Sequence, residues 1–141
     1  MSALIIAGYA SLFGHEDLGG DIVERGAFAE SLSRRRSVPM LYQHEAGEPV
    51  GRWTRIIEDR RGLWVEGEIL ALSPRGRTAS DLVARGVLDG LSIGFRTRGF
   101  TPRRPRGRRL TSIDLWEVSI VTFPMLPQAR LQVQPAAQKA A

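Results

Sequence analysis

The sequence predicts one mainly β domain of the α+β class: a single antiparallel barrel of about six or seven strands with flanking helices. Its 141 residues are the usual size of one domain. Short apolar or alternating runs, separated by turns that contain glycine or proline, outnumber the two helical patterns. These runs do not follow the regular strand–helix alternation of a parallel sheet, so an antiparallel barrel or sandwich is favoured.

The first part of the chain predicts two strands and a short helix. Residues 3–10 are a short apolar run followed by a polar, Gly-rich loop, which is typical of a buried strand. Phe28 and Leu32 lie four residues apart, as one face of a short helix requires, and this helix should cover one end of the sheet. Residues 38–44 predict another strand, and Pro39 favours a strand start or an edge position there.

The middle of the chain has the pattern of a β-hairpin. Residues 50–58 and 63–70 flank the turn sequence 59–62, and we expect Gly62 to take a positive φ in that turn. In the second arm, apolar residues alternate with mostly polar ones. One face of that strand should therefore be buried, and the other should be mostly exposed.

A second helix is predicted after this hairpin. Ser73 and Pro74 have the chemistry of an N-cap and a first helical position. Leu82, Val83 and Val87 then supply an apolar face, so we expect the helix to continue to about Gly90.

The last part of the chain predicts two strands and a tail. The strands cover residues 91–100 and 110–123, and the Pro-, Arg- and Gly-containing segment 101–109 connects them. The Ala- and Gln-rich residues 132–141 predict an unstructured tail. The domain is therefore expected to span residues 1–131.

Composition excludes several classes of protein. The longest apolar stretch is far below the roughly 18 residues that a membrane span needs, and it lacks the basic flank of a secretory signal. The absence of cysteine excludes disulfides, thiolate metal sites and cysteine nucleophiles. No metal or nucleotide motif is found, so we expect neither a membrane partner nor a metal or other cofactor.

The net charge of +5 is unevenly distributed. Residues 1–70 contain 8 arginines and 11 acids, whereas residues 71–141 contain 11 arginines, one lysine and 4 acids. Seven arginines and no acid fall within residues 96–109. This segment is interpreted as a solvated hairpin tip or as a docking site for an acidic segment. A small barrel that binds nucleic acid is the alternative, although few stacking aromatics lie near this segment.

Two residues are candidates for catalysis by their positions in predicted strands. His44 directly follows an apolar strand. A histidine at a strand end is held rigidly while its ring faces a rim or cleft, which suits a general base. A structural role is the alternative. Ser92 lies between two glycines in residues 90–94, which match the letters of the Gly-x-Ser-x-Gly nucleophile elbow. Because a strand rather than a helix follows, the α/β-hydrolase fold is excluded, and the glycines instead allow close backbone approach.

Glu117 is a third candidate because it interrupts a strand whose two faces are both apolar. Alternation over residues 113–123 places Leu115, Glu117 and Ser119 on one face, so the carboxylate should be at least partly buried and needs a partner. A histidine would make it the third member of a serine-protease triad, and a salt bridge to an arginine is the alternative. Ser119 is a rival nucleophile that ranks below Ser92.

Seven short motifs, in this order and spacing, resemble the tailed-phage prohead protease family. That family includes the proteases of gene transfer agents and belongs to the herpesvirus-assemblin-like superfamily, and the resemblance covers about residues 5–131. The motifs are Gly8-Tyr-Ala-Ser-Leu-Phe13, Val23-Glu-Arg-Gly-Ala-Phe28, Leu41-Tyr-Gln-His44, Pro49-Val-Gly51, Gly62-Leu-Trp-Val65, Gly90-Leu-Ser-Ile-Gly-Phe95 and Leu115-Trp-Glu-Val-Ser-Ile-Val-Thr-Phe-Pro124.

The resemblance implies a serine endopeptidase with an assemblin-like barrel that cleaves the scaffold region of the major capsid protein, and also itself, during head maturation. By motif, His44 is the general base, Ser92 the nucleophile and Glu117 the third member. The implied location is the procapsid within the cytoplasm of the bacterial host, and the implied assembly is a homodimer. A non-catalytic capsid-assembly factor is the alternative function. Residues 124–130 are the candidate source of an oxyanion hole.

Overall fold

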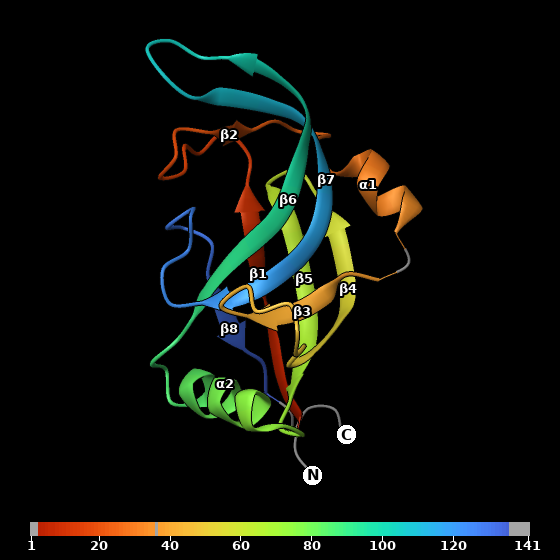
Figure 1. Ribbon diagram of the computed structural model, residues 1–141, viewed down its shortest axis with the longest axis vertical. Coiled ribbons are helices and arrows are strands. Elements are labelled where there is room, and N and C mark those ends of the chain that lie inside the picture. Colours follow the sequence, from red (N-terminus) through yellow and green to blue (C-terminus); the bar gives the residue numbers. More distant parts are fainter. Residues whose placement is uncertain (1–2, 36, 136–141) are drawn as a thin grey trace.

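The computed structural model describes residues 3–35 and 37–135 and contains two helices and eight strands (Figure 1). In chain order the elements are β1 (Ala3–Leu12), β2 (Ile22–Val23), α1 (Ala29–Arg34), β3 (Pro39–Tyr42), β4 (Gly51–Glu58), β5 (Gly62–Leu70), α2 (Pro74–Ala84), β6 (Gly90–Pro102), β7 (Arg108–Val121) and β8 (Leu131–Val133). The predicted strands and both predicted helices are present. The two additional strands are β2 and β8, the shortest of the eight.

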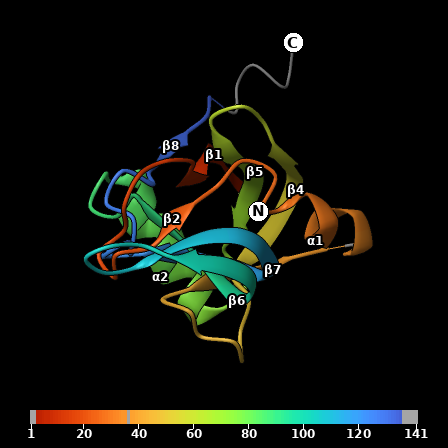
Figure 2. The ribbon, with the colours of Figure 1, turned by 90° about the horizontal axis from the view of Figure 1, so that it is seen from above.

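One sheet contains all the strands, in the order β2-β7-β3-β4-β5-β1-β8, with β6 also paired to β7. Five of the strand pairs are antiparallel; the pairs that β7 makes with β2 and β3 are parallel. Figure 2 shows β1, β4 and β5 on one side of the molecule and β6 and β7 on the other. The predicted class, a mainly antiparallel β domain with flanking helices, is confirmed.

The sheet curls back on itself near the start of β6. The N–H of Leu91 donates to the carbonyl of Ala129 at 2.9 Å, and the N–H of Leu131 donates to the carbonyl of Asp89 at 2.9 Å. These bonds join the start of β6 to the start of β8, which pairs with β1. In the described part of the chain β1 and β6 are not themselves paired, and residues of both strands line a cavity. The curled sheet therefore opens on the side where Ser92 lies.

The unstructured tail expected over residues 132–141 is contradicted at its first residues. Gln132 and Val133 belong to β8, which pairs with β1, and the N–H of Gln134 donates to the carbonyl of Ile5 at 2.7 Å. Such a short strand leaves little local signal, because the hydrogen-bonding edge of β1 and the burial of Leu131 hold it in place. Residues 136–141 of the expected tail lie outside the described residues.

The helix α2 begins as predicted and ends earlier. The hydroxyl of Ser73 accepts from the N–H of Gly76 at 3.1 Å, which is the predicted N-cap. The helix ends at Ala84 because Gly86 takes a φ of 74° and closes a Schellman motif, with Val87 N–H bonded to the carbonyl of Leu82. The expectation of a helix to Gly90 with Val87 on its apolar face is therefore wrong, and Val87 is 68% exposed.

The core is an apolar cluster that the strands enclose, and α1 contributes to it from outside the sheet, beside β4 and β7. Phe28 is fully buried immediately before α1. In β5 the predicted alternation is confirmed, because Leu63, Val65 and Ile69 are fully buried while the residues between them, apart from Gly67, are partly exposed. None of the described helices is long and apolar enough to cross a membrane.

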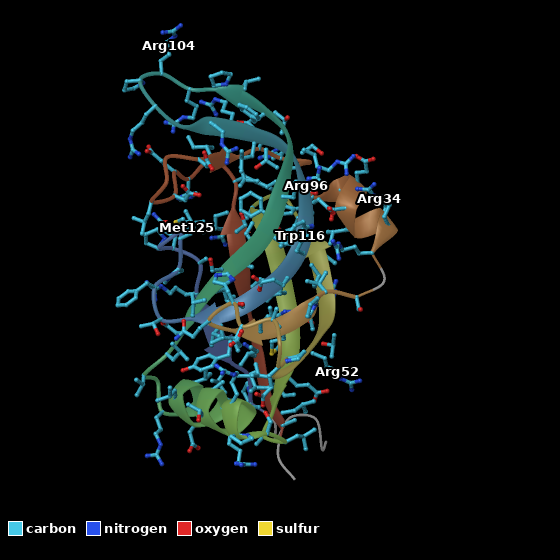
Figure 3. All side chains as sticks on the ribbon, in the orientation of Figure 1. Arg34, Arg52, Arg96, Arg104, Trp116 and Met125 are labelled. Atoms are coloured by element: carbon cyan, nitrogen blue, oxygen red, sulfur yellow. The ribbon has the colours of Figure 1, made fainter. Side chains whose placement is uncertain are left out.

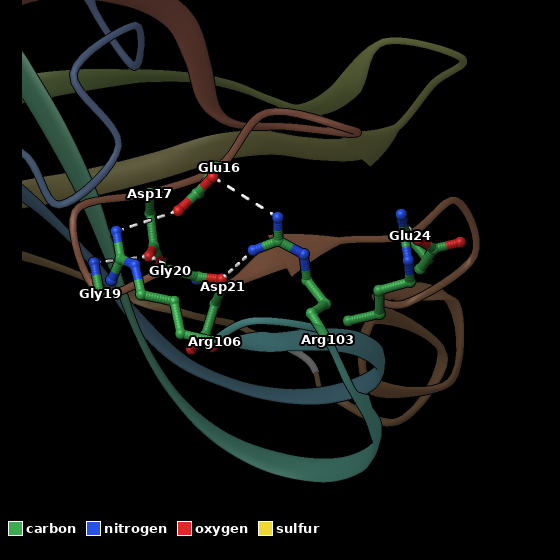
Figure 4. A network of polar contacts seen from close by, with 9 residues as sticks. Glu16, Asp17, Gly19, Gly20, Asp21, Glu24, Arg103 and Arg106 are labelled. Carbon is green, nitrogen blue, oxygen red and sulfur yellow. Dashed lines mark hydrogen bonds and ion pairs between the residues drawn. The ribbon is translucent and has the colours of Figure 1, made fainter.

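Most of the Arg-rich segment is bound by acids of this same chain (Figure 4). Arg103 and Arg106 both form ion pairs with Glu16, at 3.5 Å and 3.1 Å. Arg108 binds both carboxylate oxygens of Asp21, at 3.1 Å and 2.8 Å. The interpretation as a solvated hairpin tip is therefore wrong for Arg103, whose side chain is 19% exposed, but not for Arg106, which is paired and still 63% exposed. It holds for Arg104, which points away from the molecule at the hairpin tip (Figure 3).

The turn before β5 differs from the prediction at Gly62, whose φ is not positive. The Asp59 carboxylate closes this turn by accepting from the N–H groups of Arg61 and Gly62, at 2.8 Å and 3.0 Å. Glycine is required for a different reason. A Cβ at this position would lie 2.9 Å from the carbonyl carbon of Ser11 and 3.0 Å from the Cα of Leu12, because the paired strand β1 approaches closely here.

We predict that Gly62→Ala destabilises the fold by about 1–3 kcal/mol, because the added methyl group forces the backbones of β1 and β5 apart. Chemical denaturation measures the change in the free energy of unfolding. Gly47→Ala is the matched control, since a Cβ there meets no atom within 4 Å and the φ of Gly47 is not positive. Equal stability of the two variants would contradict this account of Gly62.

Candidate active site

Three adjacent strands place the predicted residues Ser92, Glu117 and His44 around one stretch of β7. In the antiparallel pair of β6 and β7, Ser92 lies opposite Ser119 and Gly94 lies opposite Glu117. On the other side of β7, the parallel strand β3 brings Leu41 beside Ser119. His44 follows β3 by two residues. The strand register therefore gathers residues that are far apart in the sequence.

His44 lies in a turn with an unusual backbone conformation. Gln43 and His44 have φ angles of 54° and 60°, a region that residues other than glycine rarely adopt. Hydrogen bonds to β7 and the residue after it hold the turn. The N–H of Gln43 donates to the carbonyl of Ile120 at 2.9 Å, and the Gln43 amide donates to the hydroxyl of Thr122 and accepts from its N–H. Strained backbone of this kind persists only where surrounding contacts determine it, and it is common at active sites.

The imidazole of His44 is bound by the carboxylate of Glu117. His44 Nδ1 forms a hydrogen bond with Glu117 Oε2, and Glu117 Oε1 accepts from the hydroxyl of Ser119 at 2.7 Å. An ionised carboxylate only accepts hydrogen bonds, so the imidazole proton lies on Nδ1 and the lone pair of Nε2 stays free. The hydrogen bond to Glu117 raises the pKa of His44 above its ordinary value of 6.5, although partial burial opposes this change.

The carboxylate of Glu117 lies on the face of β7 opposite the apolar core, which differs from the predicted alternation. The register shifts where Phe95 pairs with Leu115 directly after Gly94 pairs with Glu117, so Trp116 has no partner on β6. This bulge reverses the alternation, and Leu115 packs in the core while Glu117 does not. The side chain of Glu117 is 13% exposed, in agreement with the predicted partial burial.

Glycine at position 94 makes room for this carboxylate. A Cβ on Gly94 would contact the Glu117 carboxyl group and would lie 2.7 Å from its Cδ. Gly90 has a similar constraint, because a Cβ there would lie 2.6 Å from the carbonyl oxygen of Val121. The close backbone approach predicted for the glycines on either side of Ser92 is therefore present at Gly90, whereas Gly94 is approached by a side chain.

Ser92 and His44 line the same cavity, which has a volume of about 430 Å³. Ser92 is 6% exposed and, among the described residues, its hydroxyl makes no hydrogen bond to His44. Such bonds are often long in an unliganded enzyme and shorten when substrate binds. The apolar part of the lining comes from β1, β2, β6 and two loops, and consists of Ala10, Leu12, Leu18, Val23, Leu91, Ile93, Phe95, Phe123, Met125 and Leu126.

Ser119, the rival nucleophile, has no access to this cavity. It is fully buried, and its hydroxyl proton is donated to Glu117. The same oxygen accepts from the backbone N–H of His44 at 3.1 Å. Sequence reasoning missed this contact and those of Gln43 and Thr122, because polar residues at strand ends carry no signal for such bonds.

The fold is that of the herpesvirus proteases. The crystal structure of the KSHV protease with a hexapeptide phosphonate inhibitor aligns with a TM-score of 0.64 and 17% identity, over 98% of this chain and 68% of that one. The varicella-zoster virus protease aligns with a TM-score of 0.60 and 18% identity, over 98% of this chain and 67% of that one.

The chain belongs to the caudovirus prohead serine protease family, whose sequence model matches residues 1–140. It is 39% identical over 132 residues to the prohead protease of Enterobacteria phage HK97, which covers 89% of this chain and 57% of that protein. It is also 29% identical over 101 residues to the capsid polyprotein of Pseudomonas phage PAJU2, covering 67% of this chain and 15% of that protein. The chain thus spans little more than half of the first relative and a small part of the second.

We predict that His44 titrates with a pKa above 6.5 and that Glu117→Gln lowers this pKa, because the variant removes the negative charge that stabilises the imidazolium. An NMR titration measures this directly, since His15 is the only other histidine and serves as the internal reference. Because a general base must be neutral, any activity that uses His44 should increase as pH rises through this raised pKa. An unchanged pKa in Glu117→Gln would contradict the assignment.

We also predict that Gly94→Ala keeps the fold but displaces the carboxylate of Glu117, because the new methyl group contacts the mobile end of that side chain rather than backbone. The pKa of His44 should then fall toward 6.5 while the unfolding midpoint changes little. The same NMR titration, together with thermal denaturation, tests this. A large loss of stability with an unchanged pKa would show that Gly94 serves packing instead.

Proposed function

We propose that this chain is a serine endopeptidase in which Ser92 is the nucleophile, His44 the general base and Glu117 the third member of the triad. The observation that carries the proposal is the hydrogen bond from His44 to Glu117 beside the cavity that Ser92 lines. Membership of the prohead serine protease family supports the same assignment. The order of these residues along the chain is His, Ser, acid.

The proposed reaction is acyl transfer to Ser92. As Ser92 Oγ forms a bond to the scissile carbonyl carbon, His44 Nε2 accepts the hydroxyl proton and Glu117 stabilises the resulting imidazolium. The C–N bond then breaks as His44 returns the proton to the leaving amine. A water molecule, deprotonated by His44, releases the acyl group and regenerates Ser92.

The loop between β7 and β8 is the proposed source of the oxyanion hole. Met125 and Leu126 both line the cavity that contains Ser92. Within the described part of the chain, neither of their backbone N–H groups donates a hydrogen bond to another residue. Free N–H groups held at such a position can stabilise the negative charge that develops on the carbonyl oxygen.

The proposed substrates are the scaffold region of a major capsid protein and the protease itself. The names of the two phage relatives, a prohead protease and a capsid polyprotein, support a role in capsid maturation. Exposed apolar side chains at the rim of the cavity, Leu18, Phe123 and Met125, offer a surface for substrate side chains. On this proposal the enzyme acts inside the procapsid in the host cytoplasm, as a homodimer and without a cofactor.

We predict that a fluorophosphonate forms a covalent adduct with the wild-type protein at Ser92, because His44 activates this hydroxyl. The adduct should be absent in Ser92→Ala and reduced by at least about a hundredfold in rate in His44→Ala. Intact mass spectrometry followed by peptide mapping gives both the extent and the position of labelling.

Circular dichroism of each variant is the control for folding in this experiment. A folded wild-type protein that shows no adduct at high reagent concentration would contradict the proposal and favour a non-catalytic assembly factor. An adduct on Ser119 that persists in Ser92→Ala would show that the nucleophile is misassigned.

A further inference from the structure

We propose that Ser119 is a positioning residue, whose buried hydroxyl fixes Glu117 and the backbone of His44 in the geometry that the triad requires. This inference rests on the proposed function of the site. Ser119 lies on β7 with Ser92 opposite it on β6 and Leu41 beside it on β3. It therefore lies at the centre of the short stretch of β7, residues 118–120, that pairs with β3 on one edge and with β6 on the other.

The hydroxyl of Ser119 makes two hydrogen bonds that together join Glu117 and His44. It donates its proton to Glu117 Oε1 at 2.7 Å and accepts from the backbone N–H of His44 at 3.1 Å. The other oxygen of Glu117 binds His44 Nδ1. Ser119, Glu117 and His44 thus form a closed ring of contacts that includes both the main chain and the side chain of the histidine.

This ring constrains two groups that would otherwise be free to move. A glutamate side chain has three rotatable bonds, and hydrogen bonds to both carboxylate oxygens fix the plane of the carboxylate. The turn at His44 has a strained φ of 60° and needs an acceptor for its N–H. Without Ser119, both Glu117 Oε1 and the N–H of His44 would lose their partner. Among the described residues, the hydroxyl of Ser119 bonds to Glu117 and to the backbone of His44 and not to Ser92, so its action is through these two residues.

Ser31 of helix α1 provides a matched comparison, because it also bonds to strand β7. It is also buried, at 1% exposed, and its hydroxyl accepts from the N–H of Leu115 on β7 at 2.9 Å. Its hydrogen bonds do not reach His44 or Glu117. A serine that only satisfies a buried backbone group is therefore available as a control for the general cost of removing such a hydroxyl.

The pKa of His44 distinguishes a positioning role from a purely electrostatic one. If Ser119 only partly neutralises the carboxylate by donating a hydrogen bond, its removal strengthens the attraction of Glu117 for the imidazolium and raises the pKa of His44 further. If Ser119 holds the carboxylate in place, its removal weakens the bond to His44, and the pKa falls toward 6.5. The two explanations predict changes of opposite sign.

The experiment compares the full chain with Ser119→Ala and Ser31→Ala by NMR titration of His44 and by the rate of fluorophosphonate labelling at Ser92. We expect similar losses of thermal stability in both variants. The pKa of His44 should fall only in Ser119→Ala, and the labelling rate should drop about tenfold to a hundredfold there while Ser31→Ala labels at the wild-type rate. An unchanged or raised pKa of His44 in Ser119→Ala would overturn the proposal.

Two features keep this test decisive. Ser119→Cys places a somewhat larger group there that is only a weak hydrogen-bond donor, so it should show the same direction of change without leaving a cavity. The titration needs no catalytic activity. If the wild-type protein is not labelled, the proposed function fails, and the pKa of His44 still tests the role of Ser119. If the wild-type protein is labelled and Ser119→Ala matches it in both measurements, only the role of Ser119 is rejected.

Discussion

The arrangement of this molecule depends on the pairing of the long strand β7 with strands on both of its edges. Along one edge it pairs with β6, and along the other it pairs with β3 and the short β2. A shift of the β6 register by one residue would turn Ser92 to the opposite face from Glu117. A shift of β3 would move His44 away from Ser119. The candidate site therefore exists only in the observed register of these strands.

The bulge at Trp116 lets the same strand serve both the core and the site. On one side of the bulge, Ile113 and Leu115 pack in the core, and on the other side Val118 does so. Without the extra residue, Glu117 would share a face with Leu115, inside the apolar cluster, where an ionised carboxylate costs several kcal/mol. The bulge instead directs the carboxylate toward His44. A carboxylate in this position can stabilise an imidazolium.

The fold class could be predicted from the sequence because apolar alternation and turn residues are local signals. The pattern of β5 and the N-cap at Ser73 are examples. Gly86 also indicates the end of α2, but the apolar spacing that includes Val87 favoured a longer helix. Residues of β2 and β8 could not be predicted, since their partners in the sheet rather than their own side chains define them. The candidate triad was found from residue type and family resemblance. The contacts among its members depend on the strand register and on the bulge, and neither could be predicted from the sequence.

Several arginines in the second half of the chain bind acids of one loop in the first half. The loop of residues 14–21 lines the cavity, and its backbone joins the loop between β7 and β8 through a bond from Leu18 N–H to the Met125 carbonyl at 2.9 Å. Arginines of the β6–β7 hairpin hold this loop by binding Glu16, Asp21 and the carbonyl of Gly20. Individual exposed ion pairs contribute little, about 0–1 kcal/mol each. Several pairs on one loop act together, so the basic hairpin helps to hold this wall of the cavity. Four of the seven arginines in residues 96–109 are thereby paired with acids of the same chain.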